Sequence, residues 1–297
     1  MSVLTWVDRA GEEVGRIGEA AINANPALSP DGTRVAVDIA DLKASNVNIW
    51  LETTSGSDNA RFTFEPTEEI NAVWSRDGSM VTYRSFASNS SEILLKRATG
   101  LEKERVLLRN PGVLDDLLPN SWSADGKQLL FTDQSPSRTY LATVPSGGGE
   151  KVALLNSKAN ETDGQISPDG KWVAYASDES GAWEIYVSSF PGAAGKWQAS
   201  RGGGSEPRWR GDGKEIFYIA PSGMLTAVPV NGETTFATGQ PSPLFQIHGH
   251  APISSTDIFS HDVAKDGKRF LVNRYPKPEH VPPLTILLNI ANGNGSP

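Results

Sequence analysis

The sequence predicts an all-β fold built from one short unit that is repeated six times along 297 residues. Each unit carries an Asp-Gly pair, and successive pairs are 46, 48, 44, 43 and 54 residues apart. The pairs are Asp31-Gly32, Asp77-Gly78, Asp125-Gly126, Asp169-Gly170, Asp212-Gly213 and Asp266-Gly267. A period in the forties indicates a six-bladed β-propeller with one four-stranded antiparallel blade per unit. The 29 glycines and 20 prolines also suit short strands joined by tight turns.

The second unit displays the expected order of elements most clearly. A strand at 70–75 leads into the turn Arg76-Asp77-Gly78, and further strands follow at 79–84, 92–96 and 105–108. Asp-Gly suits the first hairpin because Gly accepts a positive φ and Asp bonds back to the backbone. The same template places the first strands of the other units at about 25–29, 118–123, 162–167, 205–210 and 258–264.

The expected blades follow one another without a domain boundary, so residues 1–290 form a single propeller. They cover about 19–64, 65–110, 113–156, 157–201, 202–247, and 251–290 together with 3–18. Because the last unit is short, we expect 3–18 and 284–290 to share a sheet with 258–274. Pairing the N- and C-terminal strands in one blade closes the ring and removes both exposed edges. Residues 291–297 are expected to form a disordered tail.

A large apolar residue precedes the turn motif in every unit. These residues are Leu28, Trp74, Trp122, Ile166, Trp209 and Val263. Their shared position on the first strand predicts that they belong to the core, where they pack one blade against the next.

Polar residues recur four positions before the turn motif, where the first strands begin. This ring consists of Asn25, Asn71, Pro119, Asp163, Glu206 and Ser260. Since equivalent positions surround one axis, Asn25, Asn71, Asp163, Glu206 and Ser260, with His261, are the candidates for a ligand site at the mouth of the channel. The alternative is structural, because short polar side chains also satisfy backbone groups and hold channel water.

Composition argues against several classes of function. A net charge of −8 opposes binding to nucleic acid, and no stretch reaches the ~20 apolar residues that a membrane span needs. The chain has no cysteine, which excludes disulfides and thiolate metal sites but leaves the compartment open. The N-terminus does not resemble a signal peptide. We expect a monomer without membrane insertion by this segment.

Catalytic and cofactor motifs are missing from the sequence. It contains no G-x-S-x-G elbow and no H-R-D or D-F-G triplet, so no catalytic residue is assigned. His248-Gly249-His250, His261 and Asp262 include metal-ligand residue types, but they lie in or after an irregular connection without a fixed spacing. We therefore predict no metal and no cofactor.

The repeats Leu28-Ser29-Pro30-Asp31-Gly32 and Ile166-Ser167-Pro168-Asp169-Gly170 resemble those of the TolB-like β-propellers, which carry WD40-like repeats. Stretches such as 5–9, 177–181, 195–198 and 203–209 are closer to the propeller found C-terminal to the membrane anchor of bacterial serine/threonine kinases. The last two units depart from the pattern, since Arg210 and Ala264 replace the leading serine. The resemblance implies a periplasmic or otherwise extracytoplasmic module.

These observations predict a non-catalytic scaffold that binds a protein or peptide partner, or a small ligand. The resemblance suggests either the sensor module of a kinase or a TolB-like periplasmic protein. Two alternatives remain open. The first is a lyase or hydrolase that uses Asp163, Glu206 or His261 at the funnel as acid or base. The second is a propeller domain detached from a peptidase.

Overall fold

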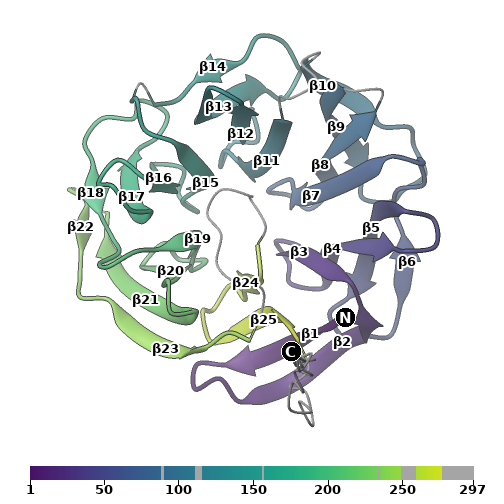
Figure 1. Cartoon of the computed structure of the whole chain (residues 1–297), viewed down its shortest axis with the longest axis horizontal. Coiled ribbons are helices and arrows are strands. Elements are labelled where there is room, and N and C mark those ends of the chain that lie inside the picture. The colour runs from purple at the N-terminus through teal and green to yellow at the C-terminus, as the bar shows by residue number, and fades with distance from the viewer. Residues whose placement is uncertain (88–89, 111–115, 156, 233–234, 249–258, 276–297) are drawn as a thin grey trace, which may run out of the picture.

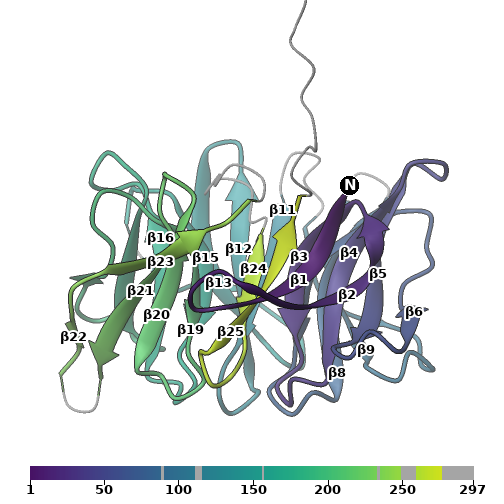
Figure 2. The same cartoon turned by 90° about the horizontal axis from the view of Figure 1, so that it is seen from below.

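The computed structural model describes residues 1–87, 90–110, 116–155, 157–232, 235–248 and 259–275. Six antiparallel sheets surround a central axis like the blades of a fan (Figure 1). Seen from the side, their strands run between the two faces of the ring (Figure 2). No helix occurs among the residues described. The predicted all-β, six-bladed propeller is therefore confirmed.

The first three blades each contain four strands in chain order. Blade one consists of β3 (Asn23–Leu28), β4 (Arg34–Asp41), β5 (Asn46–Thr53) and β6 (Asn59–Arg61). Blade two consists of β7 (Glu68–Trp74), β8 (Met80–Ala87), β9 (Ser90–Arg97) and β10 (Arg105–Asn110). Blade three consists of β11 (Asp116–Trp122), β12 (Gln128–Ser135), β13 (Arg138–Pro145) and β14 (Val152–Ala153).

The remaining blades repeat this plan with two variations. Blade four consists of β15 (Glu161–Ile166), β16 (Trp172–Ser177), β17 (Glu184–Ser189) and β18 (Trp197–Gln198). Blade five consists of β19 (Ser205–Trp209), β20 (Glu215–Ile219), β21 (Met224–Asn231), β22 (Ala237–Thr238) and β23 (Ser242–Gln246). In blade five the outer position is divided, because β22 and β23 pair with different stretches of β21. The closing blade contains β24 (His261–Val263), β25 (Arg269–Arg274), β1 (Ser2–Asp8) and β2 (Glu13–Ala21).

The N-terminal strand closes the ring. β1 pairs with β25 from Val3 opposite Arg274 to Asp8 opposite Arg269, and its other edge pairs with β2. The expected sharing of one blade by the two ends of the repeat array is confirmed for these strands. The expected strand at 284–290 and the tail at 291–297 lie outside the described residues. The treatment of residues 1–290 as a single domain stays a prediction.

The core lies between neighbouring blades and does not form one central mass. One cluster, for example, joins Ile49 and Phe62 of blade one to Trp74 and Tyr83 of blade two. Of the six apolar residues that precede the turns, Trp74, Trp122, Ile166 and Val263 are buried as predicted. Leu28 and Trp209 are only partly buried and pack at the margins of their clusters.

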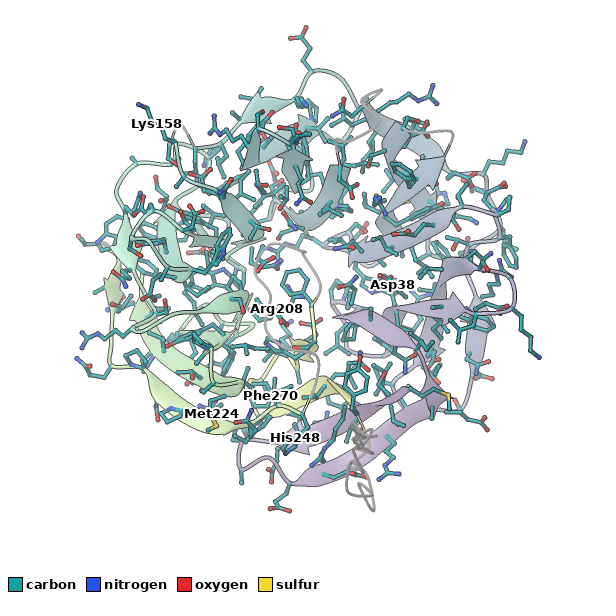
Figure 3. All side chains as sticks on the ribbon, viewed as in Figure 1. Asp38, Lys158, Arg208, Met224, His248 and Phe270 are labelled. Carbon is teal, nitrogen blue, oxygen red and sulfur yellow. The ribbon has the colours of Figure 1, made fainter. Side chains whose placement is uncertain are left out.

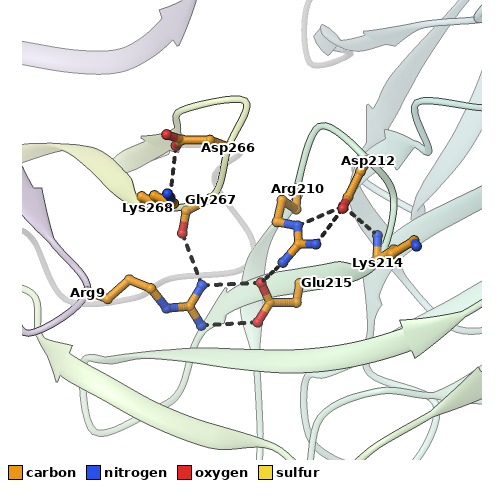
Figure 4. Close-up of polar contacts among 8 residues, drawn as sticks. All are labelled: Arg9, Arg210, Asp212, Lys214, Glu215, Asp266, Gly267 and Lys268. Atoms are coloured by element: carbon orange, nitrogen blue, oxygen red, sulfur yellow. Dashed lines mark hydrogen bonds and ion pairs between the residues drawn. The ribbon is translucent and has the colours of Figure 1, made fainter.

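An ion network links the closing blade to blade five (Figure 4). Arg9, in the turn after β1, donates to both carboxylate oxygens of Glu215 at 3.0 and 3.2 Å. It also donates to the carbonyl oxygen of Gly267 at 3.0 Å. Arg210 approaches the same Glu215 carboxylate at 2.8 Å. The N-terminal segment is thus tied to two Asp-Gly turns that lie more than 200 residues away along the chain.

Candidate functional site

Four residues of the polar ring adopt a left-handed backbone conformation. Asn25, Asn71, Asp163 and Glu206 have φ values of 49°, 57°, 58° and 53°. Each coincides with an irregularity in the register between the first and second strands of its blade. Asn and Asp tolerate this region best among residues with a Cβ atom, which explains their recurrence here. Pro119 belongs to the same ring but does not adopt the left-handed conformation, because the φ of proline is restricted to negative values.

The ring residues bind one another across blade boundaries and form a belt around the axis. Asp163 accepts the backbone N–H of Glu206 at 3.1 Å, and Glu206 accepts the N–H of Ser260 at 2.6 Å. Asn25 accepts the N–H of Phe259 at 2.7 Å and donates to Asn71 at 3.2 Å. Side chains of the ring therefore cap the backbone of a neighbouring blade, which is the structural alternative that the sequence leaves open.

Asp38 completes the belt, although the sequence pattern of the first strands does not include it. Its carboxylate accepts the Asn25 side-chain amide at 2.7 Å and the Asn71 backbone N–H at 3.0 Å. Burial raises the pKa of Asp38 to about 7, against the opposing effect of these two hydrogen bonds. Asp38 lies on β4, so only a search for polar residues on second strands could have found it.

His261 and Glu206 lie together inside the belt. The His261 Nδ1 atom is 3.4 Å from Glu206 Oε2, and both side chains are almost fully buried. The Ser260 hydroxyl donates to the same Glu206 oxygen at 2.8 Å. The structure thus brings Glu206, Ser260 and His261 together, with Asp163 one blade away. Their role in binding a ligand stays a prediction.

A large axial cavity opens at the other mouth of the channel. Its volume is about 680 Å³, and its lining includes the Asp-Gly turn of blade one and the ends of the innermost strands. Asn25, Asn71 and Pro119 contribute the belt side of this funnel. Asp163, Glu206, Ser260 and His261 are not among its lining residues. The ligand site that the sequence predicts lies where the strands begin, whereas this cavity lies where they end.

The six apolar residues that precede the turns all line this funnel. The three tryptophans among them are anchored by their ring N–H groups. Trp74 donates to the carbonyl oxygen of Ala27 at 2.9 Å, Trp122 to the hydroxyl of Thr82 at 2.9 Å, and Trp209 to the carbonyl oxygen of Gln165 at 2.8 Å. Each bond joins neighbouring blades, so the indoles are held in place as walls.

Two arginines of the funnel differ in how they are engaged. Arg76 extends from blade two and donates to the carbonyl oxygens of Trp122, Ile166 and Ser167 at 3.1–3.2 Å. Arg208 lies near the axis (Figure 3) and its Cζ atom is 3.6 Å from the ring centroid of Phe259. Arg208 Nε is 3.4 Å from an Asp262 carboxylate oxygen. The funnel therefore combines fixed aromatic surfaces with positive charge.

Among the described residues, no group of three or more His, Asp or Glu side chains is arranged to hold a metal ion. Gly249 and His250 of the histidine pair lie outside the described residues. The described strands and turns include no helix that is long and apolar enough to cross a bilayer.

Six blades around an axial cavity define a β-propeller. The chain belongs to the TolB beta propeller domain family, whose model matches residues 73–239. A solved TolB-like structure from Agrobacterium tumefaciens shares the fold, with a TM-score of 0.70 and 15% sequence identity. That likeness covers 93% of this chain and 99% of the other.

Two relatives are similar in sequence over part of the chain. The Tol-Pal system protein TolB of Francisella tularensis is 25% identical over 60% of this chain and 40% of its own length. The uncharacterized peptidase YuxL of Bacillus subtilis is 26% identical over 56% of this chain and 24% of its own length. The chain thus matches only two fifths or less of each relative.

Proposed function

We propose that this propeller is a non-catalytic binding module that holds a protein or peptide partner in the axial funnel at the Asp-Gly face. The observation that carries the proposal is the cavity of about 680 Å³, which is open to the surface and walled by anchored indoles. Cavities of roughly 300–1,000 Å³ with mainly apolar walls and a few polar groups are typical binding sites. Membership of the TolB propeller family supports the same role.

The buried state of the belt supports binding over catalysis. His261 Nδ1 and Glu206 Oε2 are 3.4 Å apart without forming a hydrogen bond, and the two side chains are 0% and 3% exposed. Glu206 also holds the backbone of the next blade through Ser260. A substrate atom would have to displace this contact to reach the pair. The belt is therefore assigned to holding the blades together.

A substitution that enlarges a side chain in the funnel tests the proposal directly. Ala27 lines the cavity and is only partly buried, so Ala27→Leu narrows the funnel without removing a hydrogen bond. A displayed library of random dodecapeptides is selected on the wild-type protein, and the recovered peptides are titrated against both forms. We expect Ala27→Leu to weaken binding about tenfold or more, while Leu101→Ala, at a site 90% exposed, leaves it unchanged. Equal binding to both variants, or no recovered peptide, would overturn the proposal.

The compartment and the parent protein are part of the proposal. By resemblance to TolB-like and kinase-associated propellers, we place the module outside the cytoplasm, as a periplasmic protein or as the sensor of a membrane-anchored serine/threonine kinase. The similarity to a Tol-Pal system protein supports the periplasmic form. Reading the gene upstream of Met1 distinguishes them: a kinase domain and an anchor favour the sensor, and an exported frame without them favours the periplasmic protein.

The second candidate is a substrate-binding propeller within a peptidase. It is favoured by the similarity to YuxL, of which this chain spans about a quarter. In that case the peptide in the funnel is a substrate that a separate domain cleaves. A G-x-S-x-G motif downstream in the reading frame would support it, since the elbow marks the nucleophile of α/β-hydrolases.

A further inference from the structure

The guanidinium of Arg208 occupies the inner part of the funnel. Arg208 lies on β19 and lines the cavity, and its side chain is 11% exposed. Figure 3 places it close to the axis of the ring. Burial lowers the pKa of Arg208, while the carboxylates of Asp262, Glu206 and Asp163 act in the opposite direction. A charge at this depth is costly unless its N–H groups find partners.

The described residues engage only part of this guanidinium. One face stacks on the Phe259 ring at 3.6 Å, and Nε lies 3.4 Å from Asp262 Oδ1. Asp262 is itself held by backbone donors, since its two oxygens accept the N–H groups of Leu28 at 2.7 Å and Val263 at 2.8 Å. The two terminal nitrogens of Arg208 make no hydrogen bond to any residue that the structure describes. Up to four N–H donors are therefore available in the funnel.

Arg76 provides the contrast within the same cavity. Its guanidinium donates to three backbone carbonyls and is thereby committed to holding blades two, three and four together. Arg76 is a structural cation, whereas the guanidinium of Arg208 is stacked on a ring, and its terminal nitrogens form no hydrogen bond with the described residues. A planar fork fixed in this way matches a carboxylate, which can accept two parallel N–H bonds.

The surroundings of Arg208 favour an anion on the side of blade five and the closing blade. Lys265 and Arg269 also line the funnel there, and Arg269 lies over the Trp6 ring at 5.0 Å. The acidic residues on this wall serve the backbone: Asp262 as described, and Asp266 by accepting the N–H of Lys268 at 2.9 Å. On this wall, three cations (Arg208, Lys265 and Arg269) thus face the cavity against two carboxylates that already hold backbone amides.

The belt carboxylates lie on the inner side of Arg208. The carboxylates of Asp163 and Glu206 favour the charged form of Arg208. Each of them also accepts a hydrogen bond from a backbone N–H of the next blade. Neither residue lines the funnel. A ligand that enters from the Asp-Gly face therefore meets Arg208, which lines the funnel, and not these two carboxylates.

We propose that the funnel selects partners carrying a carboxylate, which binds the terminal nitrogens of Arg208 while the adjoining apolar part of the ligand packs on the tryptophan walls. The proposal deepens the proposed function, because the partner is the peptide held in the axial cavity. Two sources supply this chemistry: the α-carboxylate at a peptide's C-terminus and the side chain of an Asp or Glu residue.

Changing the ligand on the wild-type protein tests the proposal without any risk to folding. Peptides are selected from a random dodecapeptide library displayed with a free C-terminus, synthesised, and titrated by calorimetry. Each is compared with a C-terminally amidated form and with forms in which Asp or Glu is replaced by Asn or Gln. We expect one of these changes to weaken binding about tenfold to a hundredfold, as the loss of a charged hydrogen-bonded pair implies. The sensitive change identifies the source of the carboxylate.

Variants of the protein then connect that effect to Arg208. In Arg208→Met the same peptide and its neutral form should bind equally, and Arg208→Lys should retain part of the discrimination because it keeps the charge without the fork. Full discrimination in a folded Arg208→Met protein would overturn the proposal. So would peptides whose binding is blocked by Ala27→Leu but is insensitive to every neutralising change, and that result would leave the proposed function intact.

Discussion

The six Asp-Gly turns have the same backbone conformation but different capping side chains. A serine caps the turn in the first four blades, and other residues take its place in the last two. In blades one to four a serine hydroxyl donates to the turn Asp at 2.6 Å and accepts the first N–H of the next strand at 2.9–3.0 Å. In blade five Arg210 takes the serine position and pairs with Asp212 and Glu215. In blade six the position is Ala264, and among the described residues the Asp266 side chain accepts a hydrogen bond only from the N–H of Lys268.

The backbone bonds of all six turns are nonetheless equivalent. The glycine N–H donates to the carbonyl of the residue three positions earlier at 2.8–2.9 Å, in Ser-led turns and in the last two alike. The Asp-Gly pair therefore determines the turn, and the side chain that caps it is replaceable. Where the serine is missing, the tertiary contacts of Arg9 reinforce the turns (Figure 4).

Valine in place of the turn glycine should have the largest effect, and it should be the same in both regions. Gly126 and Gly213 have φ values of 68° and 72°, and a Cβ atom at either position meets no close neighbour. Gly126→Val and Gly213→Val should each lower the free energy of unfolding by about 2 kcal/mol through backbone strain alone. Urea unfolding measures both. A cost confined to one of them would break the equivalence of the turns.

Loss of the Glu215 carboxylate should have the second-largest effect on stability, and only the last two turns should be weakened. Glu215 pairs with Arg9 and Arg210, and its side chain is 13% exposed. Glu215→Gln should reduce the free energy of unfolding by about 1–2 kcal/mol, and the difference from wild type should shrink in 1 M NaCl because salt screens the pairs. Thermal unfolding at two salt concentrations measures it. A salt-independent loss would show that charge is not what replaces the serine.

Removing one serine cap should have a smaller and salt-independent effect. Ser123→Ala deletes the bonds to Asp125 and from Gln128 N, at 2.6 and 3.0 Å, and should cost about 1 kcal/mol. The reciprocal change, Ala264→Ser, should stabilise by about 0.5 kcal/mol if the hydroxyl can form the same relay in blade six. Denaturant titration of both variants decides the matter. A destabilised Ala264→Ser protein would contradict the interchangeability of the caps.

The smallest effect should appear in the titration of the turn carboxyls. The hydroxyl of Ser75 lowers the pKa of Asp77 to about 2, and the guanidinium of Arg210 does the same for Asp212. Because these values lie below that of an unfolded Asp, ~3.9, the stability they confer is present at neutral pH and is lost as pH falls from about 4 towards 2. Addition of 1 M NaCl should raise the pKa of Asp212 and leave that of Asp77 nearly unchanged. Carboxyl NMR titration measures both values. Equal responses would remove the distinction between hydroxyl and ion-pair caps.

Local chemistry made much of the propeller predictable from the sequence. Asp-Gly specifies a tight turn because of backbone sterics, and its recurrence predicts the repeat, the first strands and the closure of the ring. The ring at Asn25, Asn71, Asp163 and Glu206 was also visible, because a left-handed position in a strand favours particular residue types. The sequence could not reveal the partners of these side chains, which lie in neighbouring blades.

Long-range contacts decided the rest. Asp38 joins the belt, Arg208 stacks on Phe259, and Arg9 reaches Glu215 only after six blades have closed around one axis. Closure also decided which mouth of the channel holds the described funnel. The sequence alone therefore determined the repeated turn, which follows from contacts a few residues apart, and the recurrence of that turn determined the fold. The tertiary structure decided the site, since its lining comes from all six blades, which surround one cavity only after the ring has closed.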